Sequence, residues 1–343
     1  MGFRWFAHFL FVILKIRMNL LIVCNPGAGR GKGKKHAENL SAMIKSLGAA
    51  QGSLSVEIFE AVAIGKMYDH WASNSGNPRN YDAVVLIGGD GTVGLNIDAM
   101  IKNDVKIPIY VYGKGTANDV AGFFKTDTSE KKAAQTILNY NLIEMDTLRV
   151  LQKDNVLTYG INVACGGAFT NGVTKYGSTS KRIFSKFAYK IKAAIQALTM
   201  PAQKIRFTAG CGGGDCDSTE EIVIEDEIFL FNILNTANVG TLKGVAPRAD
   251  ISDGLFDLVA VKKCGFLGKC SVFFSMKFKR IHKCKRIIYI QGASFKVDPI
   301  PPITRNFTYS DIDGNAGGEY PLVVTPGPKI KVVARKYPLC ETH

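Results

Sequence analysis

The sequence lacks several patterns that would place it in a class at once. Its eight cysteines contain no CxxC pair and no Cys/His set at zinc spacing, which excludes a zinc-ribbon protein. It has no internal repeat and no low-complexity linker, which argues against a solenoid or a disordered chain. No GK[ST] triplet closes a glycine-rich loop, so a Walker phosphate loop is absent.

Two features of the sequence leave alternatives open. Cys211 and Cys216 flank a glycine run, where a metal or a disulfide is the alternative to reduced cytosolic thiols. The apolar run Trp5–Leu14 is too short to span a bilayer and precedes no small-residue cleavage site. Residues 1–17 are therefore either a dispensable extension before a start at Met18, which we favour, or a short interfacial segment.

The sequence does contain a large apolar fraction and an excess of positive charge. The 343 residues are 46% hydrophobic and 21% charged, which is typical of a globular protein with two domains. The formal net charge of +14 predicts an anionic partner, which is nucleic acid, nucleotide phosphates or an anionic membrane. Because no nucleic-acid-binding motif is recognisable, nucleic acid is not expected.

The stretch LIGGDGT, residues 86–92, is the most informative part of the chain. The run over 83–87 is uniformly apolar, as in a parallel strand that is buried on both faces. Glycines after such a strand let backbone N–H groups approach a ligand, and open α/β sheets bind ligands at that edge. The stretch indicates a phosphate-binding loop that contains a carboxylate, Asp90, and the alternative is an ordinary strand-to-helix turn.

Two other predicted strands end in loops of the same kind. A strand over 19–24 leads into the glycine-rich, cationic turn 25–34, and a helix over 35–47 follows. A strand over 107–112 leads into the loop GKGTAND, residues 113–119. Alternating strands and helices predict a parallel sheet with right-handed crossovers, which brings the three loops to one edge. Three such loops support phosphate binding far better than one.

The second half of the chain has a different pattern, with several strands and few helices. The predicted strands are 144–151, 156–163, 204–208, 227–233 and 255–261, and the one clear helix is 184–198. The predicted fold class is α/β, with an N-terminal doubly wound parallel nucleotide-binding domain and a C-terminal mainly antiparallel β-sandwich domain. The first domain covers 18–143 and is completed by 320–337, and the second covers 144–319.

Five motifs in a fixed order carry a family resemblance. They are NPGAG (25–29), GGDGT (88–92), GTAND (115–119), PRADISDGLFD (247–257) and IDG (312–314). Over a match from about Met18 to about Ala334, the chain resembles the soluble bacterial diacylglycerol kinase and lipid kinase family. That family shares its nucleotide domain with sphingosine kinases and, more distantly, with NAD kinases.

The resemblance implies an ATP-dependent lipid kinase that uses Mg²⁺. Asp90 would lie close to the phosphates and their magnesium, since a carboxylate can hold the metal directly or through water. For Thr116 and Asn118 the alternative role is turn formation and capping. The residues implied in ATP binding are Asn25, Pro26, Gly27, Ala28, Gly29, Gly88, Gly89, Asp90, Gly91, Thr92, Gly115, Thr116, Asn118 and Asp119.

The resemblance also implies a structural magnesium site at Asp250, Asp253 and the backbone carbonyl of Leu255. Oxygen ligands along one turn, followed by a glycine, suit a hard cation. The alternative is an acidic β-turn over 252–254. In the family, such a site links the second domain, which would bind the lipid, to activity.

The last motif departs from the family pattern. The family's general base is a glutamate directly after Asp-Gly, and this chain has Asn315 there, whose amide cannot accept a hydroxyl proton. Asp313 or Glu319 could stand in if the loop bends, although the GG-x-x-P spacing assigns Glu319 to another family position. Gly94-Leu95 also replaces the family's usual Asn-Glu, and Ala61 replaces a polar nucleotide contact.

Three hypotheses for the activity follow. In the first, the protein is a working kinase that transfers the γ-phosphate of ATP to diacylglycerol or a related lipid alcohol, in phospholipid biosynthesis. In the second, it is a degenerate homologue that binds nucleotide and lipid with little turnover. NAD kinase activity is the third and least favoured.

The expected partner is a membrane lipid. Residues 277–286, KFKRIHKCKR, place seven cations or potential cations within ten residues, which fits an anionic bilayer surface and equally a solvated edge. We expect a cytoplasmic protein with peripheral membrane contact, and we leave a homodimer open.

Overall fold

The chain divides into two compact units, each described here by itself. Unit 1 runs to Glu144 and includes the chain from Ile330 onward, and unit 2 is Met145–Lys329. Unit 2 thus extends past residue 319, where the sequence pattern placed its end. The computed structural model describes residues 17–49, 53–61, 63–77, 79–126, 129–167, 200–210, 221–240 and 242–335.

Three features discussed above lie outside the described residues. They are the predicted helix over 184–198, the pair Cys211 and Cys216, and residues 1–16.

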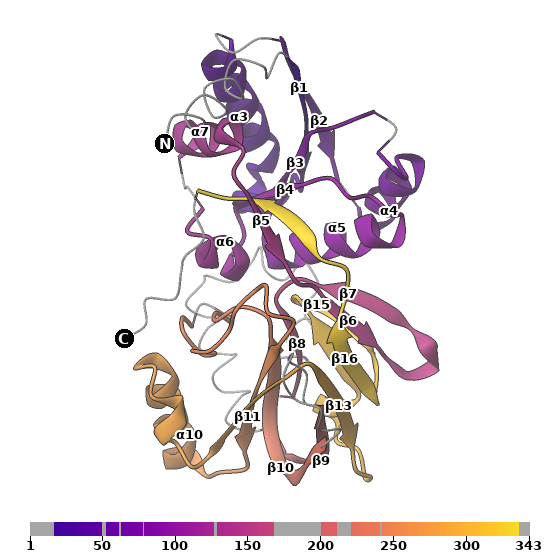
Figure 1. Cartoon of the computed structure of the whole chain (residues 1–343). Coiled ribbons are helices and arrows are strands. Elements are labelled where there is room, and N and C mark those ends of the chain that lie inside the picture. Colours follow the sequence, from indigo (N-terminus) through magenta and orange to yellow (C-terminus); the bar gives the residue numbers. More distant parts are fainter. Residues whose placement is uncertain are drawn as a thin grey trace, which may run out of the picture. The chain divides into compact units, whose positions relative to one another are not determined.

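Unit 1 is built on a six-stranded sheet with the order β2-β1-β3-β4-β17-β5 (Figure 1). Its strands are β1 (Arg17–Cys24), β2 (Ser53–Glu60), β3 (Ala83–Gly88), β4 (Ile109–Gly113), β5 (Leu142–Met145) and β17 (Ile330–Val333). β1 pairs in parallel with β2 and β3, and β4 pairs in parallel with β3 and β17. Because β17 comes from the far end of the chain, both ends of the described chain contribute to this sheet.

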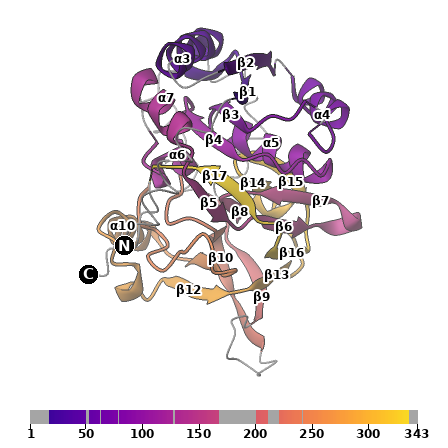
Figure 2. The ribbon, with the colours of Figure 1, turned by 45° about the horizontal axis from the view of Figure 1, so that its top comes forward.

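Helices cover both faces of the unit 1 sheet (Figures 1 and 2). They are α2 (Ala28–Gly31), α3 (Gly33–Gly48), α4 (Ile64–Ser73), α5 (Asp90–Lys102), α6 (Asp119–Phe123) and α7 (Glu130–Asn139). On one face, Leu40 of α3 and Ile137 of α7 share an apolar core with Leu20 and Ile22 of β1. α4 and α5 pack together against the other face. The predicted doubly wound α/β fold is confirmed.

Local sequence explains these elements. All six residues of β3 are buried, as expected for an apolar parallel strand that is covered on both faces. In α3, Ala37, Leu40 and Ile44 recur at helical spacing and are fully buried. α7 begins where the hydroxyl of Ser129 accepts the backbone N–H of Lys132 at 3.3 Å. Strands β1, β3 and β4 end at Cys24, Gly88 and Gly113, so each of the three glycine loops directly follows a strand.

Unit 2, in its described part, is an antiparallel sheet of eleven strands. They are β6 (Leu148–Leu151), β7 (Leu157–Gly160), β8 (Val163–Gly167), β9 (Gln203–Gly210), β10 (Glu221–Leu234), β11 (Phe256–Lys262), β12 (Ile287–Gly292), β13 (Ser294–Pro299), β14 (Tyr309–Ile312), β15 (Asn315–Glu319) and β16 (Leu322–Pro326). The long strand β10 pairs with β9 through its first half and with β8 and β11 through its second half. The predicted antiparallel second domain is confirmed.

One apolar core serves most of the unit 2 sheet. It includes Leu148 of β6, Phe231 of β10, Phe295 of β13 and Ile312 of β14, all of them buried. Strands β6 and β14 are far apart in the sheet order, so the sheet must curve around this core. Short 3₁₀ turns complete the described elements: η1 (Lys153–Asn155), η3 (Ile281–Lys283) and η4 (Arg305–Phe307).

Unit 2 departs from the prediction in several places, since none of the strands β12 to β16 was predicted and three other differences are local. The run 144–151 is divided into β5 and β6 by the buried pair Asp146-Thr147, and the run 156–163 is divided into β7 and β8. The helix α10 (Phe266–Lys277) was not predicted, because apolar residues occur on both of its faces and form no single stripe. No helix in the described ranges is long and apolar enough to cross a membrane.

Candidate functional site

The three glycine loops of unit 1 are joined to one another by backbone hydrogen bonds, where β1, β3 and β4 lie side by side. After β1, the N–H of Asn25 donates to the carbonyl of Ile87 in β3 at 3.0 Å. After β4, the N–H of Lys114 donates to the carbonyl of Gly88 at 2.7 Å. The N–H of Gly29 in turn donates to the carbonyl of Lys114 at 2.8 Å, which connects the first loop to the third.

The first loop is shaped by one asparagine and by glycine. The Oδ1 of Asn25 accepts the N–H of Gly27 at 2.9 Å, and its Nδ2 donates to the hydroxyl of Thr92 in α5 at 3.2 Å. Gly29 has a φ of 60°, in the left-handed region that favours glycine. A Cβ on Gly33 would lie 2.0 Å from the carbonyl oxygen of Asn25, so this approach also requires glycine.

The second and third loops approach each other backbone to backbone. A Cβ built on Gly115 would lie 2.3 Å from the Cα of Gly89, which leaves no room for any side chain there. Asn118 has a φ of 54°, and its side chain accepts the N–H of Gly115 at 2.6 Å and donates to the carbonyl of Gly115 at 3.1 Å. In this structure the side chain of Asn118 therefore closes a turn.

Asp90 lies where the second and third loops meet. It is the first residue of α5, directly after the N-cap Gly89, and a carboxylate is stabilised at this end of a helix by the macrodipole. Its Oδ1 accepts the N–H of Val120 in α6 at 3.2 Å. The other predicted nucleotide residues lie in the same loops or in the first turns of the helices that follow, namely Pro26, Ala28, Gly91, Thr116 and Asp119.

Positive charge accumulates beside these loops. α3 begins after Lys32 with no side-chain cap and no acidic residue in its first turn, and such a helix end attracts anions. The ammonium of Lys114 lies 4.0 Å from the centroid of the Tyr112 ring. Burial lowers the pKa of Lys114, and the attraction of Glu130 opposes that shift. Glycine-rich loops, an uncapped helix end and cations can together bind a phosphate group.

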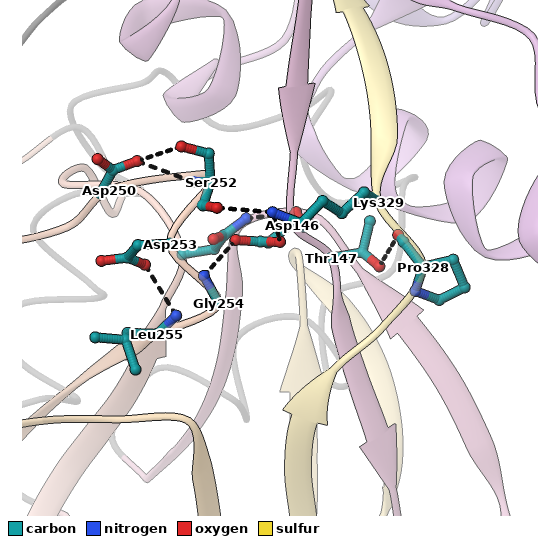
Figure 3. A network of polar contacts seen from close by, with 10 residues as sticks. Asp146, Thr147, Asp250, Ser252, Asp253, Gly254, Leu255, Pro328 and Lys329 are labelled. Carbon is teal, nitrogen blue, oxygen red and sulfur yellow. Dashed lines mark hydrogen bonds and ion pairs between the residues drawn. The ribbon is translucent and has the colours of Figure 1, made fainter. Parts of the chain in front are cut away.

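A second polar cluster lies in unit 2, around the acidic turn before β11 (Figure 3). The Oδ1 of Asp250 accepts the N–H of Ser252 at 3.0 Å and its hydroxyl at 2.8 Å. The Oδ1 of Asp253 accepts the N–H of Leu255 at 2.9 Å. The pKa of Asp253 is raised, first by burial and then by the negative charges of Asp250 and Asp146. A cation at this turn would relieve that repulsion.

The predicted magnesium ligands Asp250, Asp253 and Leu255 therefore fall on one turn, with the hydrogen bonds of an acidic β-turn. Among the residues that the structure describes, no three His, Cys, Asp or Glu side chains are grouped closely enough to hold a metal ion. A cation here would depend on two carboxylates together with backbone carbonyls, a donor set that suits a hard ion.

Asp146 and Lys329 belong to this cluster and were not predicted (Figure 3). The Oδ2 of Asp146 accepts the N–H of Gly254 at 2.8 Å, and its Oδ1 pairs with the ammonium of Lys329 at 3.2 Å. Lys329 also donates to the carbonyl of Ser252 at 2.7 Å. The available signal was a carboxylate inside an apolar strand pattern, since carboxylates are rarely buried without a partner.

Asp257 is a second buried carboxylate that the sequence pattern did not single out. It is fully buried in β11, and its Oδ1 accepts the hydroxyl of Tyr289 at 2.5 Å. Its Oδ2 has no hydrogen-bond partner in the described part of the chain. Burial raises the pKa of Asp257 to about 6, although the hydrogen bond from Tyr289 opposes the shift.

The Asp-Gly of the last motif forms the two-residue turn of the β14–β15 hairpin. Asp313 and Gly314 have φ values of 52° and 79°, as in the tight turns that favour Asp-Gly. The Asp313 carboxylate is buried and accepts the N–H groups of Ile161 at 2.6 Å and of Asn162 and Val163 at 2.9 Å each. These contacts hold the connection between β7 and β8.

Asn315, at the position of the family's base, is the half-buried first residue of β15 and pairs across the hairpin with Ile312. Glu319, at the other end of β15, forms an ion pair of 2.8 Å with Lys153. Asp313 and Glu319, the two carboxylates that the sequence offered as substitutes for the base, are thus both engaged by other groups.

Comparison with known proteins agrees with these features. A family model, described as the diacylglycerol kinase catalytic domain, matches residues 19–150. The diacylglycerol kinase of Bacillus subtilis is 25% identical over 88% of this chain and 90% of its own length. The chain is thus similar to diacylglycerol kinases over most of its length.

Other diacylglycerol kinases are similar to this chain over most of its length. The diacylglycerol kinase of Staphylococcus saprophyticus is 23% identical over 89% of this chain and 92% of its own length. A crystal structure of a putative diacylglycerol kinase from Bacillus anthracis has a TM-score of 0.69 with 18% identity, and covers 93% of this chain and 95% of that one. That likeness shows the shared two-unit fold.

A Gly115→Ala variant tests the contact between the second and third loops. Its Cβ would meet the Cα of Gly89, so we expect the free energy of unfolding to fall by about 1–3 kcal/mol. Urea unfolding measures the change. Gly122→Ala is the matched control, because a Cβ there meets nothing within 4 Å and alanine favours a helix. Equal stability of the two variants would contradict the close approach.

Asp257 predicts a specific dependence of stability on pH. The pKa of Asp257 is higher in the folded than in the unfolded protein. Its contribution to the free energy of unfolding is therefore fully present below about pH 4 and is lost as pH rises through about 6. The stability of the native protein relative to Asp257→Asn should therefore fall by about 3 kcal/mol between those limits. Urea titrations in EDTA measure this difference, with exposed Asp104→Asn as the control, and a constant difference would contradict it.

Proposed function

We propose that this protein is a kinase that transfers the γ-phosphoryl group of ATP to a hydroxyl group of a membrane lipid, diacylglycerol or a related lipid alcohol. The observation that carries the proposal is the joining of three glycine loops at one sheet edge, with Asp90 between two of them. The lipid substrate is supported by the family and by relatives that are named diacylglycerol kinases.

The residues at this edge fit the polyphosphate of ATP. Gly33 and Gly115 let the loops pack backbone to backbone, against Asn25 and Gly89, and α3 begins beside them without a side-chain cap. The residues that would hold ATP are Asn25 to Gly29, Gly88 to Thr92 and Gly115 to Asp119. Bound Mg²⁺ would supply charge neutralisation on the phosphates.

Asp90 is assigned to the magnesium that accompanies the nucleotide. Magnesium is usually held by one or two carboxylates together with substrate phosphates, and Asp90 is the carboxylate that lies at the junction of the loops. Positioning and charge neutralisation supply most of the catalysis in phosphoryl transfer. The contribution of the chain is then to fix the loops and to place this one negative charge.

Unit 2 is assigned to the lipid, and its acidic turn to a structural magnesium ion. Asp250, Asp253 and the carbonyl of Leu255 would hold that ion, and Asp146 and Lys329 would fix the turn by their hydrogen bonds. Its role is to order the turn before β11. The enzyme would thereby act in phospholipid metabolism.

Asn315 favours a second candidate function. A general base typically contributes roughly a hundred- to ten-thousand-fold in rate, and an amide cannot take its place. The nearby Asp313 holds three backbone N–H groups and Glu319 is paired with Lys153. The second candidate is a degenerate homologue that binds nucleotide and lipid with little turnover.

An Asp90→Ala variant tests the nucleotide site itself. We expect its Mg²⁺-dependent affinity for a non-hydrolysable ATP analogue to fall by at least about 10- to 100-fold, because the carboxylate at the metal is lost. Calorimetric titration with and without Mg²⁺ measures this. Asp104→Ala, an exposed carboxylate of the same unit, is the control. Unchanged binding by Asp90→Ala would mean that the phosphates bind elsewhere.

The substrate is tested with labelled ATP, Mg²⁺ and mixed micelles that contain lipid alcohols. Label in the lipid supports the kinase proposal, and label in added NAD alone contradicts it.

An Asn315→Glu variant separates the working kinase from the degenerate homologue. If the native protein already has an effective route for the proton, which is our proposal, kcat should rise less than about 100-fold, the lower limit for a general base. Asn315→Gln keeps an amide and serves as the control. A larger rise in the glutamate variant alone would show that the native protein is impaired and would support the second candidate.

A further inference from the structure

The helix α10 carries an apolar surface that the described part of the chain leaves exposed. One side of the helix is buried through Gly268, Val272 and Met276, and the last two join the core that contains Leu230 and Val259. The other side bears large apolar residues that are half or more exposed: Phe266 (63%), Leu267 (82%), Phe273 (50%) and Phe274 (52%), followed by Phe278 (61%) just after the helix.

Ring contacts join three of these exposed residues, Phe273, Phe274 and Phe278, into one surface. Leu267, Phe274 and Phe278 recur at helical spacing on one strip of the helix, and Phe266 and Phe273, seven residues apart, share a second exposed strip. The ring of Phe274 stacks on that of Phe278 with centroids 6.3 Å apart, and it meets the ring of Phe273 edge-on at 5.8 Å. Single exposed apolar residues are ordinary, whereas a contiguous aromatic patch marks an interaction surface. We call these five residues the α10 patch.

The chain around the α10 patch carries only positive formal charge. Residues 258–297 contain ten lysines and arginines and no aspartate or glutamate. The cations at the end of the helix and just after it are exposed, and none pairs with a carboxylate among the described residues; they are Lys277, Lys279, Arg280, Lys283 and Lys285. An aromatic surface flanked by unpaired cations is complementary to lipid headgroups above acyl chains.

We propose that the α10 patch and the cations after it dock this protein on the surface of an anionic lipid bilayer. With 12 residues, α10 is too short to cross a bilayer, so it lies in the interface with its exposed face toward the acyl chains. It occupies the periphery of unit 2 in both views (Figures 1 and 2). A nucleic acid would use the cations and would leave the apolar residues exposed, so it fits the surface less well.

This docking goes beyond the proposed phosphoryl transfer, because it requires neither nucleotide nor turnover. It would bring unit 2 to the membrane in which a lipid alcohol resides. Kinase activity and membrane docking can therefore fail separately.

The test is flotation of the full chain with vesicles of phosphatidylcholine, with and without anionic phosphatidylglycerol. We expect binding to the anionic vesicles, weakened by salt, and little binding to the neutral ones. The double variant Phe273→Ser/Phe274→Ser should bind at least about tenfold more weakly. Lys283→Gln/Lys285→Gln should also bind about 25-fold more weakly, at roughly fivefold for each cation.

The matched control variants change exposed residues of unit 1 and leave the α10 patch intact. Ile64→Ser removes an apolar residue that is 59% exposed, and Lys45→Gln/Lys131→Gln removes two exposed cations; both should bind vesicles as the native protein does. All altered positions are exposed, and thermal unfolding checks that each variant folds. Asp90→Ala should also bind vesicles normally, which keeps this test independent of the kinase proposal.

Three outcomes would overturn the docking proposal. One is equal binding to neutral and anionic vesicles, and another is native-like vesicle binding by both α10-region double variants. The third is a change of oligomeric state in Phe273→Ser/Phe274→Ser with vesicle binding unchanged, which would assign the patch to contact between copies. Activity on lipid dispersed in detergent should be equal in these variants and the native protein.

Discussion

The candidate active site depends on close backbone contact between loops that follow three neighbouring strands. Gly115 approaches Gly89 so closely that no Cβ fits, and the carbonyls of Gly88 and Lys114 each accept an N–H group from another loop. These contacts exist because β3 lies between β1 and β4 in parallel register. The sheet thus brings Asp90 and the glycine loops together before any ligand binds.

The part of this site that follows from strand order was predictable from sequence. Apolar runs ending in NPGAG, GGDGT and GTAND indicate buried parallel strands, and parallel strands place their carboxyl ends at one edge. The bond from Val120 to Asp90 and the turn closed by Asn118 depend on exact loop geometry. Periodicity carries no information about such contacts, so the sequence pattern left the roles of Asp90 and Asn118 as hypotheses.

In unit 2 the sequence was less informative, because its buried charges lie within apolar patterns. Asp146 divides a predicted strand, and only the structure connects it to Gly254 and Lys329. α10 escaped prediction for the opposite reason, since Phe273 and Phe274 on its exposed face remove the polar stripe that identifies a surface helix. Both misses mark places where local pattern and burial disagree, and both bear on function.

The central claim is that the three loops bind one nucleotide together, and hydrogen–deuterium exchange tests it most directly. With Mg²⁺ and a non-hydrolysable ATP analogue, the account predicts slower exchange of backbone N–H groups over 25–33, 88–93 and 113–120 at once, at the same half-saturating concentration. The acidic turn before β11 serves as an internal comparison, and the proposal predicts that it responds to Mg²⁺ alone. Protection of only one loop, or of none, would contradict the account.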